Sequence, residues 1–204
     1  LSPTDHLEAL SDPAKEGRLL SCGRPPVFVQ VEMMDENGDL VAQGEWGEIV
    51  VRGTIVSLGY YGDEEASEAN RAHGWHHTGD IGYKDEDGFI YIVDRKKDMI
   101  ITGGLNVFPI EIERLIWSHP AVLDCAVIGV PDQKWGEAVK AVVELKTSET
   151  ANEAEIIALC KDKLSAYKAP KTVEFWDNLP RSGVGKVLKR KVRERYWAGY
   201  ERKI

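Results

Sequence analysis

The 204-residue sequence is poor in cysteine, in long apolar runs and in repeated segments. Its three cysteines, Cys22, Cys125 and Cys160, are widely separated and form no CxxC pair, which favours reduced thiols in a cytoplasmic setting over metal ligands. No apolar run approaches the roughly 18 residues that a membrane-spanning helix requires, and the polar N-terminus lacks a signal-peptide pattern. We therefore expect a cytoplasmic protein with no transmembrane segment.

Positive charge is scarce outside the C-terminal segment. From Arg181 to the end there are nine basic and two acidic residues, so this segment carries +7 while the rest carries −15 of the net −8. An acidic body disfavours general nucleic-acid affinity, and we expect no nucleic-acid partner. The basic segment is either a solvated surface or faces an anionic ligand.

The first 93 residues have the pattern of short strands joined by turns. β-Branched runs and the Asn37-Gly38 hairpin signal predict a small antiparallel sheet or barrel. A helix is expected over 63–72, whereas residues 1–24 contain several breakers and predict no regular structure. The expected strands are 27–33, 40–42, 47–53, 81–84 and 89–93.

After residue 98 the pattern alternates between helices and strands. Pro109 suits the first position of a helix, and Asn152 followed by Glu155 has the pattern of a helix N-terminal cap. A basic helix is expected over 188–200. With strands over 122–130, 138–145 and 172–176, this half predicts a compact α+β unit, and the boundary between the halves falls within 94–98.

A carboxylate at a strand entrance is the first candidate for binding a ligand. Asp80 follows Gly79, where its side chain can project into a cleft and accept hydrogen bonds from a vicinal diol such as ribose. The competing interpretation, which spacing alone favours, is an aspartate that caps a turn. Adjacent His76 and His77 point opposite ways on an extended chain and have no further ligand cluster, so we expect no metal site.

A lysine on a glycine-flexible turn is the second candidate. The run Gly183-Val184-Gly185-Lys186 departs from a phosphate-binding P-loop, because Pro180 and Val187 stand where that motif requires glycine and Ser or Thr. Lys186 can reach a phosphate or carboxylate as a compact charge, or it is one more solvated lysine.

A glycine pair, Gly103-Gly104, follows the charged run 94–98. It marks a turn that needs positive φ, or a backbone surface against which a ligand lies.

Four ordered segments together resemble the C-terminal portion of an acyl-CoA synthetase of the adenylate-forming (AMP-binding) superfamily. The similarity extends over roughly residues 23–195, and the form of the segment around the glycine pair is most similar to the fatty- and aryl-acid CoA ligases. The matching segments are 47–53 with Gly59-Tyr60, 74–81, 94–113 and 180–186.

The resemblance implies roles for three charged residues. Asp80 would hold the ribose hydroxyls of ATP and of the acyl-adenylate, and Arg95 would contact the same nucleotide. Lys186 matches the catalytic lysine that reaches the acyl carboxylate and the α-phosphate during adenylation.

The resemblance also implies a moving part. Lys97 occupies the position of a hinge, and Gly103 and Gly104 lie on the loop that faces the CoA pantetheine after rotation. Leu105 replaces a polar residue often found in that loop, which is a departure from the family pattern.

The fold implied is α+β. Residues 1–96 would be a small antiparallel, β-barrel-like subdomain that ends the large AMP-binding domain, and residues 97–204 a compact, mobile α+β C-terminal domain.

The function implied is ATP-dependent adenylation of a carboxylic acid, of the fatty or aryl class, followed by transfer to CoA through domain alternation. ATP, Mg²⁺ and CoA would be required, with the Mg²⁺ site mostly outside this chain. The family's phosphate-binding loop is absent and Leu1 is not a start methionine, so we expect a fragment that is inactive alone. The alternatives are an enzyme that loads an acyl-carrier protein, and a non-catalytic binding module that retains the fold. Homo-oligomerisation of the parent chain is left open.

Overall fold

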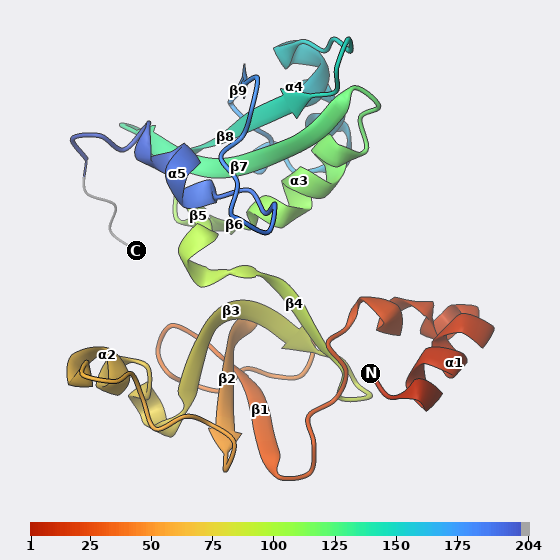
Figure 1. Cartoon of the computed structure of the whole chain (residues 1–204), viewed down its shortest axis with the longest axis vertical. Helices are drawn as coiled ribbons and strands as arrows, with labels where there is room; N and C mark the ends of the chain where they lie inside the picture. Colours follow the sequence, from red (N-terminus) through yellow and green to blue (C-terminus); the bar gives the residue numbers. More distant parts are fainter. Residues whose placement is uncertain (201–204) are drawn as a thin grey trace. The chain divides into compact units, whose positions relative to one another are not determined.

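The computed structural model, in which residues 1–200 are described, forms two compact units: Leu1–Lys96 and Lys97–Ile204. Both mix helices with sheets that are mainly antiparallel, so the predicted α+β class is confirmed (Figure 1). Within the described residues, no helix is long and apolar enough to cross a membrane.

The first unit is built on one antiparallel sheet of four strands in the order β1-β2-β3-β4. The predicted antiparallel sheet is confirmed; it is open, with β1 and β4 at its edges. Its elements are α1 (Pro3–Ser11), η1 (Pro13–Leu20), β1 (Val29–Met34), β2 (Gly47–Gly53), α2 (Glu64–Ala69), η2 (Ala72–Gly74), β3 (His76–Lys84) and β4 (Ile90–Arg95).

Alternation along β1 and β2 gives the sheet two apolar faces. Met33 and Ile49 pack with Ile90 on one face, while Met34 and Val50 pack with Trp75 on the other. Successive strand residues point to opposite faces, so adjacent apolar residues in β1 and β2 supply both clusters. The two clusters thereby hold β2 in place, from which the chain continues to β3.

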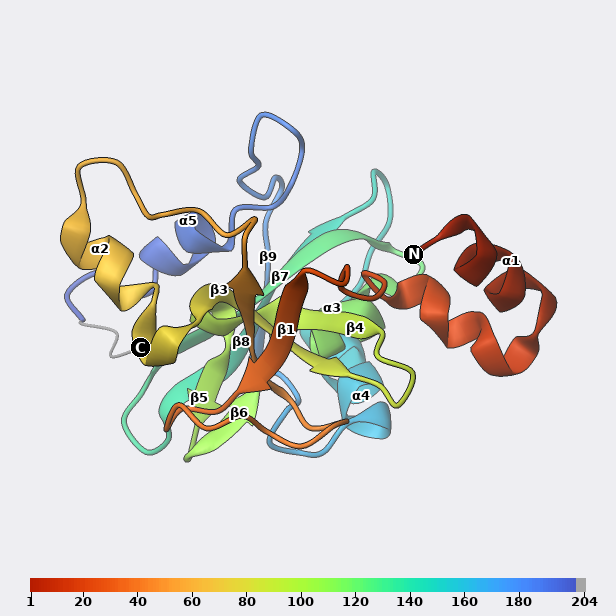
Figure 2. The ribbon, with the colours of Figure 1, turned by 90° about the horizontal axis from the view of Figure 1, so that it is seen from below.

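The prediction of an irregular N-terminus was wrong. Ser2 Oγ accepts the Asp5 N–H at 3.1 Å and Asp5 accepts the Ser2 N–H at 2.9 Å, a reciprocal cap that starts α1. Pro3, interpreted as a breaker, stands in the first turn, where proline is favourable. Figure 2 shows α1 beside η1 as a helical pair.

The predicted return strand at 40–42 was also wrong. A single bridge pairs Met34 with Leu40, and the segment then leaves the sheet. The Asn37-Gly38 turn does form, closed by an Asp35 N–H that donates to Asp39 O at 2.9 Å.

The second unit consists of a five-stranded sheet with helices on both faces. Strand β8 pairs with β7 along one edge, and its other edge is shared by β5 near its start and by parallel β9 further along. The elements are η3 (Lys96–Asp98, which begins in the first unit), β5 (Ile100–Thr102), β6 (Leu105–Val107), α3 (Pro109–Trp117), β7 (Val122–Asp132), β8 (Gly136–Leu145), α4 (Glu153–Lys163), β9 (Thr172–Phe175) and α5 (Lys189–Glu194).

Two buried clusters lie on opposite faces of the β7–β8 pair. Cys125 and Val127 face α3 and α4, whereas Ala126 and Ile128 pack with Val192 of α5. The period-two burial explains why β7 has an almost continuous apolar run, since both of its faces are covered.

Predicted helix starts in this unit are confirmed, and two other expectations need correction. Pro109 begins α3, and Asn152 and Glu155 form a reciprocal cap on α4. The basic helix is much shorter than 188–200, because α5 ends at Glu194. Residues 100–107, for which no strand was expected, form the β5–β6 hairpin around the glycine pair.

Candidate functional site

Asp80 and Arg95 lie opposite each other on neighbouring strands of the first unit. They are Cα partners in the β3–β4 register, and Arg95 Nε lies 3.1 Å from Asp80 Oδ1. The Asp80 side chain is 23% exposed and that of Arg95 60% exposed. A carboxylate and a guanidinium paired at a sheet edge present both an acceptor and a donor to an incoming polar ligand.

Asp80 owes its position to a bulge between β2 and β3. Glu48 pairs with Ile81 and Val50 pairs with His77, so residues 78–80 lie opposite Ile49 alone. Such bulges re-aim side chains and leave backbone groups without ladder partners. Gly79, with φ of +74°, supplies the left-handed turn within it.

Side chains satisfy the backbone of this bulge. Thr78 Oγ1 accepts the Asp80 N–H at 3.1 Å and donates to Ile49 O at 2.8 Å. Glu48 Oε1 accepts the Gly79 N–H at 3.2 Å. Asp80 therefore stands on backbone held from both sides.

Glu48 is a buried carboxylate that the sequence reasoning missed. Its Oε2 accepts from His77 Nδ1 at 2.9 Å and from Lys96 Nζ at 2.8 Å, and its side chain is 7% exposed. Burial opposes ionisation, but the hydrogen bonds from Lys96 and His77 outweigh it and hold the pKa of Glu48 below its ordinary value. The signal in the sequence was a glutamate at an inward strand position, where an unpaired charge is rare.

Lys97 is exposed and is the first residue of the second unit. It lies in η3, the short turn of 3₁₀ helix that follows β4. Its assignment as a hinge stays a prediction.

Gly103 and Gly104 form the two-residue turn of the β5–β6 hairpin. Thr102 pairs with Leu105, and the glycines have φ of +59° and +79°, as the hairpin turn with two left-handed residues requires. A Cβ on Gly103 would lie 2.7 Å from the Trp135 ring, and the Gly103 N–H donates to Trp135 O at 2.8 Å. The turn therefore explains this glycine pair structurally.

Lys186 lies at the end of a tight turn in the second unit. The Ser182 N–H donates to Lys186 O at 2.8 Å, and Ser182 Oγ accepts the Lys186 N–H at 3.2 Å. Gly185 has φ of +84°. Across residues 1–200 the Lys186 ammonium has no hydrogen bond or ion pair, so the backbone is anchored while the charge extends into solvent.

Arg181, which the sequence did not single out as a site residue, stabilises this turn through its side chain. It donates to Asp124 Oδ2 at 2.7 Å and Glu144 Oε2 at 2.8 Å, and more weakly to Gly185 O at 3.3 Å. Hydrogen bonds to Asp124 and Glu144 raise the pKa of Arg181 above its ordinary value. One guanidinium thus connects β7 and β8 to the turn that carries Lys186.

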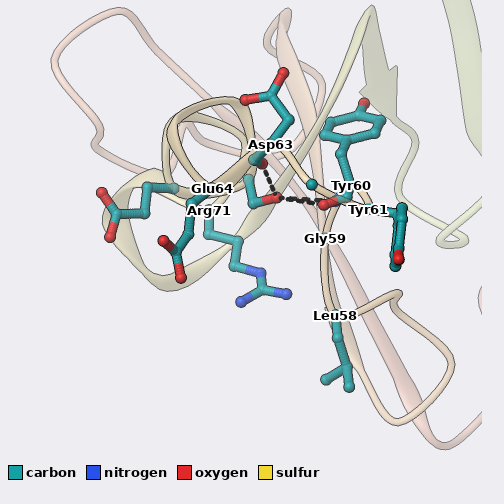
Figure 3. Close-up of a pocket in the computed structure, with 10 residues that line it drawn as sticks. Leu58, Gly59, Tyr60, Tyr61, Asp63, Glu64 and Arg71 are labelled. Atoms are coloured by element: carbon teal, nitrogen blue, oxygen red, sulfur yellow. Dashed lines mark hydrogen bonds between the residues drawn. The ribbon is translucent and has the colours of Figure 1, made fainter.

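A separate open hollow lies on the first unit beside α2 (Figure 3). Residues 58–64 line it together with Ser67, Glu68 and Arg71. Ser67 Oγ accepts the Tyr60 N–H at 2.8 Å and donates to Asp63 O at 2.6 Å. These hydrogen bonds fix the turn that carries Tyr60 and Tyr61. None of the sequence-predicted site residues lines this hollow.

The predicted residues fall into two sets. Asp80 and Arg95 are brought together in the first unit, whereas Lys186 and the glycine pair belong to separate loops of the second. In the described part of the chain, no group of three or more His, Cys, Asp or Glu side chains is placed to hold a metal ion.

Comparisons with known proteins identify relatives of this chain. Residues 111–186 match the family described as AMP-binding enzyme C-terminal domain. The chain is 47% identical over 196 residues to a medium/long-chain-fatty-acid–CoA ligase of Mycobacterium tuberculosis, covering 93% of this chain and 34% of that one. It is 46% identical over 176 residues to a feruloyl-CoA synthase of Amycolatopsis, covering 86% and 36%.

A solved structure shares the fold. The crystal structure of ATP-bound MatB from Rhodopseudomonas palustris superposes with a TM-score of 0.82 at 39% identity, covering 89% of this chain and 37% of that one. By this family match and this fold similarity, the chain resembles the enzymes of the adenylate-forming (AMP-binding) superfamily. Within it, the chain is similar to the C-terminal portion of acyl-CoA synthetases and spans about a third of the length of the curated relatives it matches.

Proposed function

We propose that this chain is part of an ATP- and CoA-dependent ligase that converts a carboxylic acid, of the fatty or aryl class, into its acyl-CoA thioester. The relatives named for fatty-acid and feruloyl substrates support this choice of acid and of acceptor. The observation that carries the proposal is the paired Asp80 and Arg95 at the β3–β4 edge, in a chain with this family similarity.

Asp80 would hold the ribose of the nucleotide. A carboxylate can accept hydrogen bonds from both hydroxyls of a vicinal diol, and such charge-assisted bonds are stronger than neutral ones. Arg95, on the opposite strand, orients the carboxylate through its Nε at 3.1 Å and keeps further N–H donors for the same nucleotide.

Lys186 would act on the reacting atoms. As the acid carboxylate attacks the α-phosphate of ATP, negative charge accumulates on the phosphoryl oxygens and pyrophosphate leaves. A positioned ammonium stabilises that charge, and such electrostatic stabilisation is often the largest contribution to the rate. The unpaired ammonium on a stabilised turn suits this role.

Thioester formation would use a different surface. The thiol of CoA attacks the acyl carbon of the adenylate and AMP leaves, so the thiol needs access from which Lys186 has withdrawn. We propose that the second unit turns about Lys97 and offers the Gly103-Gly104 turn to the pantetheine. Such alternation between two arrangements is a known way for one site to serve two steps.

ATP and CoA are substrates in this scheme. Mg²⁺ would neutralise phosphate charge, but the described residues offer no carboxylate cluster that fits it, so we assign none of them to the metal.

Pyrophosphate exchange by the full-length protein that carries this chain, over a panel of acids with and without CoA, tests the proposal. We expect ATP–pyrophosphate exchange with a fatty or aryl acid, and acyl-CoA only when CoA is added. Exchange without acyl-CoA formation would replace CoA by a carrier protein as acceptor. Absence of exchange with every acid would favour a binding module.

The 204-residue chain alone provides a second test. We expect it to form no acyl-CoA from ATP, CoA and a fatty acid, because the phosphate-binding loop is absent from its sequence. Turnover by the purified chain would contradict the proposed dependence of catalysis on a phosphate-binding loop outside this chain.

A further inference from the structure

One buried carboxylate, that of Glu48, connects the backbone next to Asp80 to Lys96 at the end of the first unit. Glu48 lies on β2 and receives three hydrogen bonds: from the Gly79 N–H, from His77 and from Lys96. These partners lie 29 to 48 residues away along the chain. None of them is a member of the set to which family similarity assigns a role.

The first connection fixes the backbone next to Asp80. Because residues 78–80 bulge away from Ile49, the Gly79 N–H has no strand partner, and the Glu48 carboxylate serves as its acceptor at 3.2 Å. A change at Glu48 would release this amide, and with it the carboxylate one residue further on.

The second connection fixes the end of the unit. Lys96 is the residue immediately before Lys97, and its ammonium lies 2.8 Å from Glu48 Oε2. The Lys96 side chain is 43% exposed while that of Glu48 is 7% exposed, so the cation reaches inward from the surface. A rotation about Lys97 needs a stationary end, and this ion pair supplies one.

The third connection joins Glu48 to the His77 imidazole. His77 places Nδ1 2.9 Å from Glu48 Oε2 and Nε2 3.1 Å from Ala72 O, so an oxygen faces each ring nitrogen. Both contacts are hydrogen bonds only when both nitrogens carry protons. A buried carboxylate that receives several hydrogen bonds, one of them from the Lys96 ammonium, is much less costly than an unpaired one.

We propose that Glu48 is a positioning residue that holds Asp80 for the nucleotide and Lys96 as the fixed side of the pivot, an inference that rests on the proposed function. Glu48 touches no substrate in this scheme. Two of its contacts act on different half-reactions. The hydrogen bond from Gly79 acts on ATP binding during adenylation, and the ion pair with Lys96 acts on the rotation that precedes thioester formation.

The test uses the full-length protein and separates the two contacts. Glu48→Gln is expected to raise the KM for ATP in pyrophosphate exchange about tenfold and to slow thioester formation from supplied acyl-adenylate by a similar factor, as loss of a charge-assisted hydrogen bond would. Thr78→Val, which removes the hydroxyl that accepts the Asp80 N–H, should raise only the KM for ATP. Lys96→Met should slow only thioester formation, and Lys96→Arg should restore it.

Glu32→Gln is the matched control, because it removes a carboxylate ion-paired to Lys84 at 2.6 Å in the same sheet. It should leave both half-reactions unchanged. If Glu48→Gln lowers the melting temperature while the kinetic constants of the folded protein stay at their original values, Glu48 is merely structural and the inference is overturned. Absence of exchange in the unaltered protein would overturn the proposed function as well, so the two failures are distinguishable.

Discussion

The two units hold their candidate charges in opposite ways. Asp80 stands on a strand, its amide bound by Thr78 and its carboxylate paired with Arg95. Lys186 stands on a turn held by its backbone hydrogen bonds, by Ser182 Oγ and by the Arg181 side chain. The first arrangement fixes the charged group itself before a ligand binds. The second fixes the backbone at Lys186 and leaves its charged side chain able to move.

This difference matches the two tasks proposed. A group that must hold a nucleotide through successive steps benefits from preorganisation, because less freedom is lost on binding. A group that must reach the reacting atoms and then withdraw requires a side chain without a permanent partner. Substitutions that alter one unit at a time therefore test whether the difference matters.

Removing the reaching charge should have the largest effect. Lys186→Ala in the full-length protein is expected to slow adenylation about 10²- to 10³-fold, the loss typical of a positioned transition-state donor. Thioester formation from supplied acyl-adenylate should be spared. Separate assays of the half-reactions measure both, with Lys191→Ala, an exposed lysine of α5, as the control. Equal loss of both half-reactions would contradict the role proposed for Lys186.

The two glycines of the β5–β6 turn differ in how closely other atoms approach them. Gly103→Ala should destabilise the 204-residue chain by about 3 kcal/mol, because it combines a left-handed backbone with a clash against Trp135. Gly104→Ala, where a Cβ meets nothing within 4 Å, should cost about 1 kcal/mol. Urea unfolding of the two variants measures the difference. Equal costs would show that Trp135 does not restrict the turn.

Removing the Arg181 contacts should have a smaller effect than removing the lysine. Arg181→Met breaks the contacts to Asp124, Glu144 and Gly185, and we expect the adenylation rate to fall about tenfold while the rate of thioester formation stays unchanged. Arg190→Met is the control, since it breaks an ion pair with Glu194 on the exposed surface of α5. A loss as large as that of Lys186→Ala would mean that Arg181 itself contacts the reacting atoms.

Thiol chemistry compares the units without affecting activity. Burial raises the pKa of Cys125 far above its usual range and raises the pKa of Cys160 to about 11, so neither is a thiolate at pH 8. Cys22, in the first unit, is exposed. Alkylation of the native chain at pH 8 should therefore modify one thiol, and in denaturant three, as counted by mass spectrometry. Rapid native labelling of Cys125 would contradict the packing of the second unit.

Local patterns predicted most of the elements because their causes lie within a few residues. Asn152 and Glu155 cap α4 across three positions, and Pro109 starts α3 at the place that proline tolerates best. The N-terminal helix was missed because Pro3 was interpreted as a breaker although it stands in a first turn. The β5–β6 hairpin was missed because strands of three residues give too short a pattern to recognise.

The site was predictable to a lesser extent. Asp80 and Arg95 lie on the two strands of one local hairpin, but their pairing also depends on a register shift between Ile81 and Gly82 that the turn does not determine. Glu48 and Lys96 are 48 residues apart, and Arg181 finds its carboxylates 37 and 57 residues away. Such pairings arise only when strands assemble, and no spacing rule in a single sequence contains them.

The tip of the β5–β6 hairpin carries no side chain. Over Gly104, where a Cβ would meet nothing within 4 Å, a partner would meet peptide groups, whereas the Trp135 ring covers one side of Gly103. Recognition through peptide groups does not depend on side-chain identity. Residues elsewhere in the loop, including Leu105, can therefore be substituted without altering the groups presented at the tip. A selective inhibitor directed at this turn would need to imitate a peptide strand rather than fill a side-chain pocket.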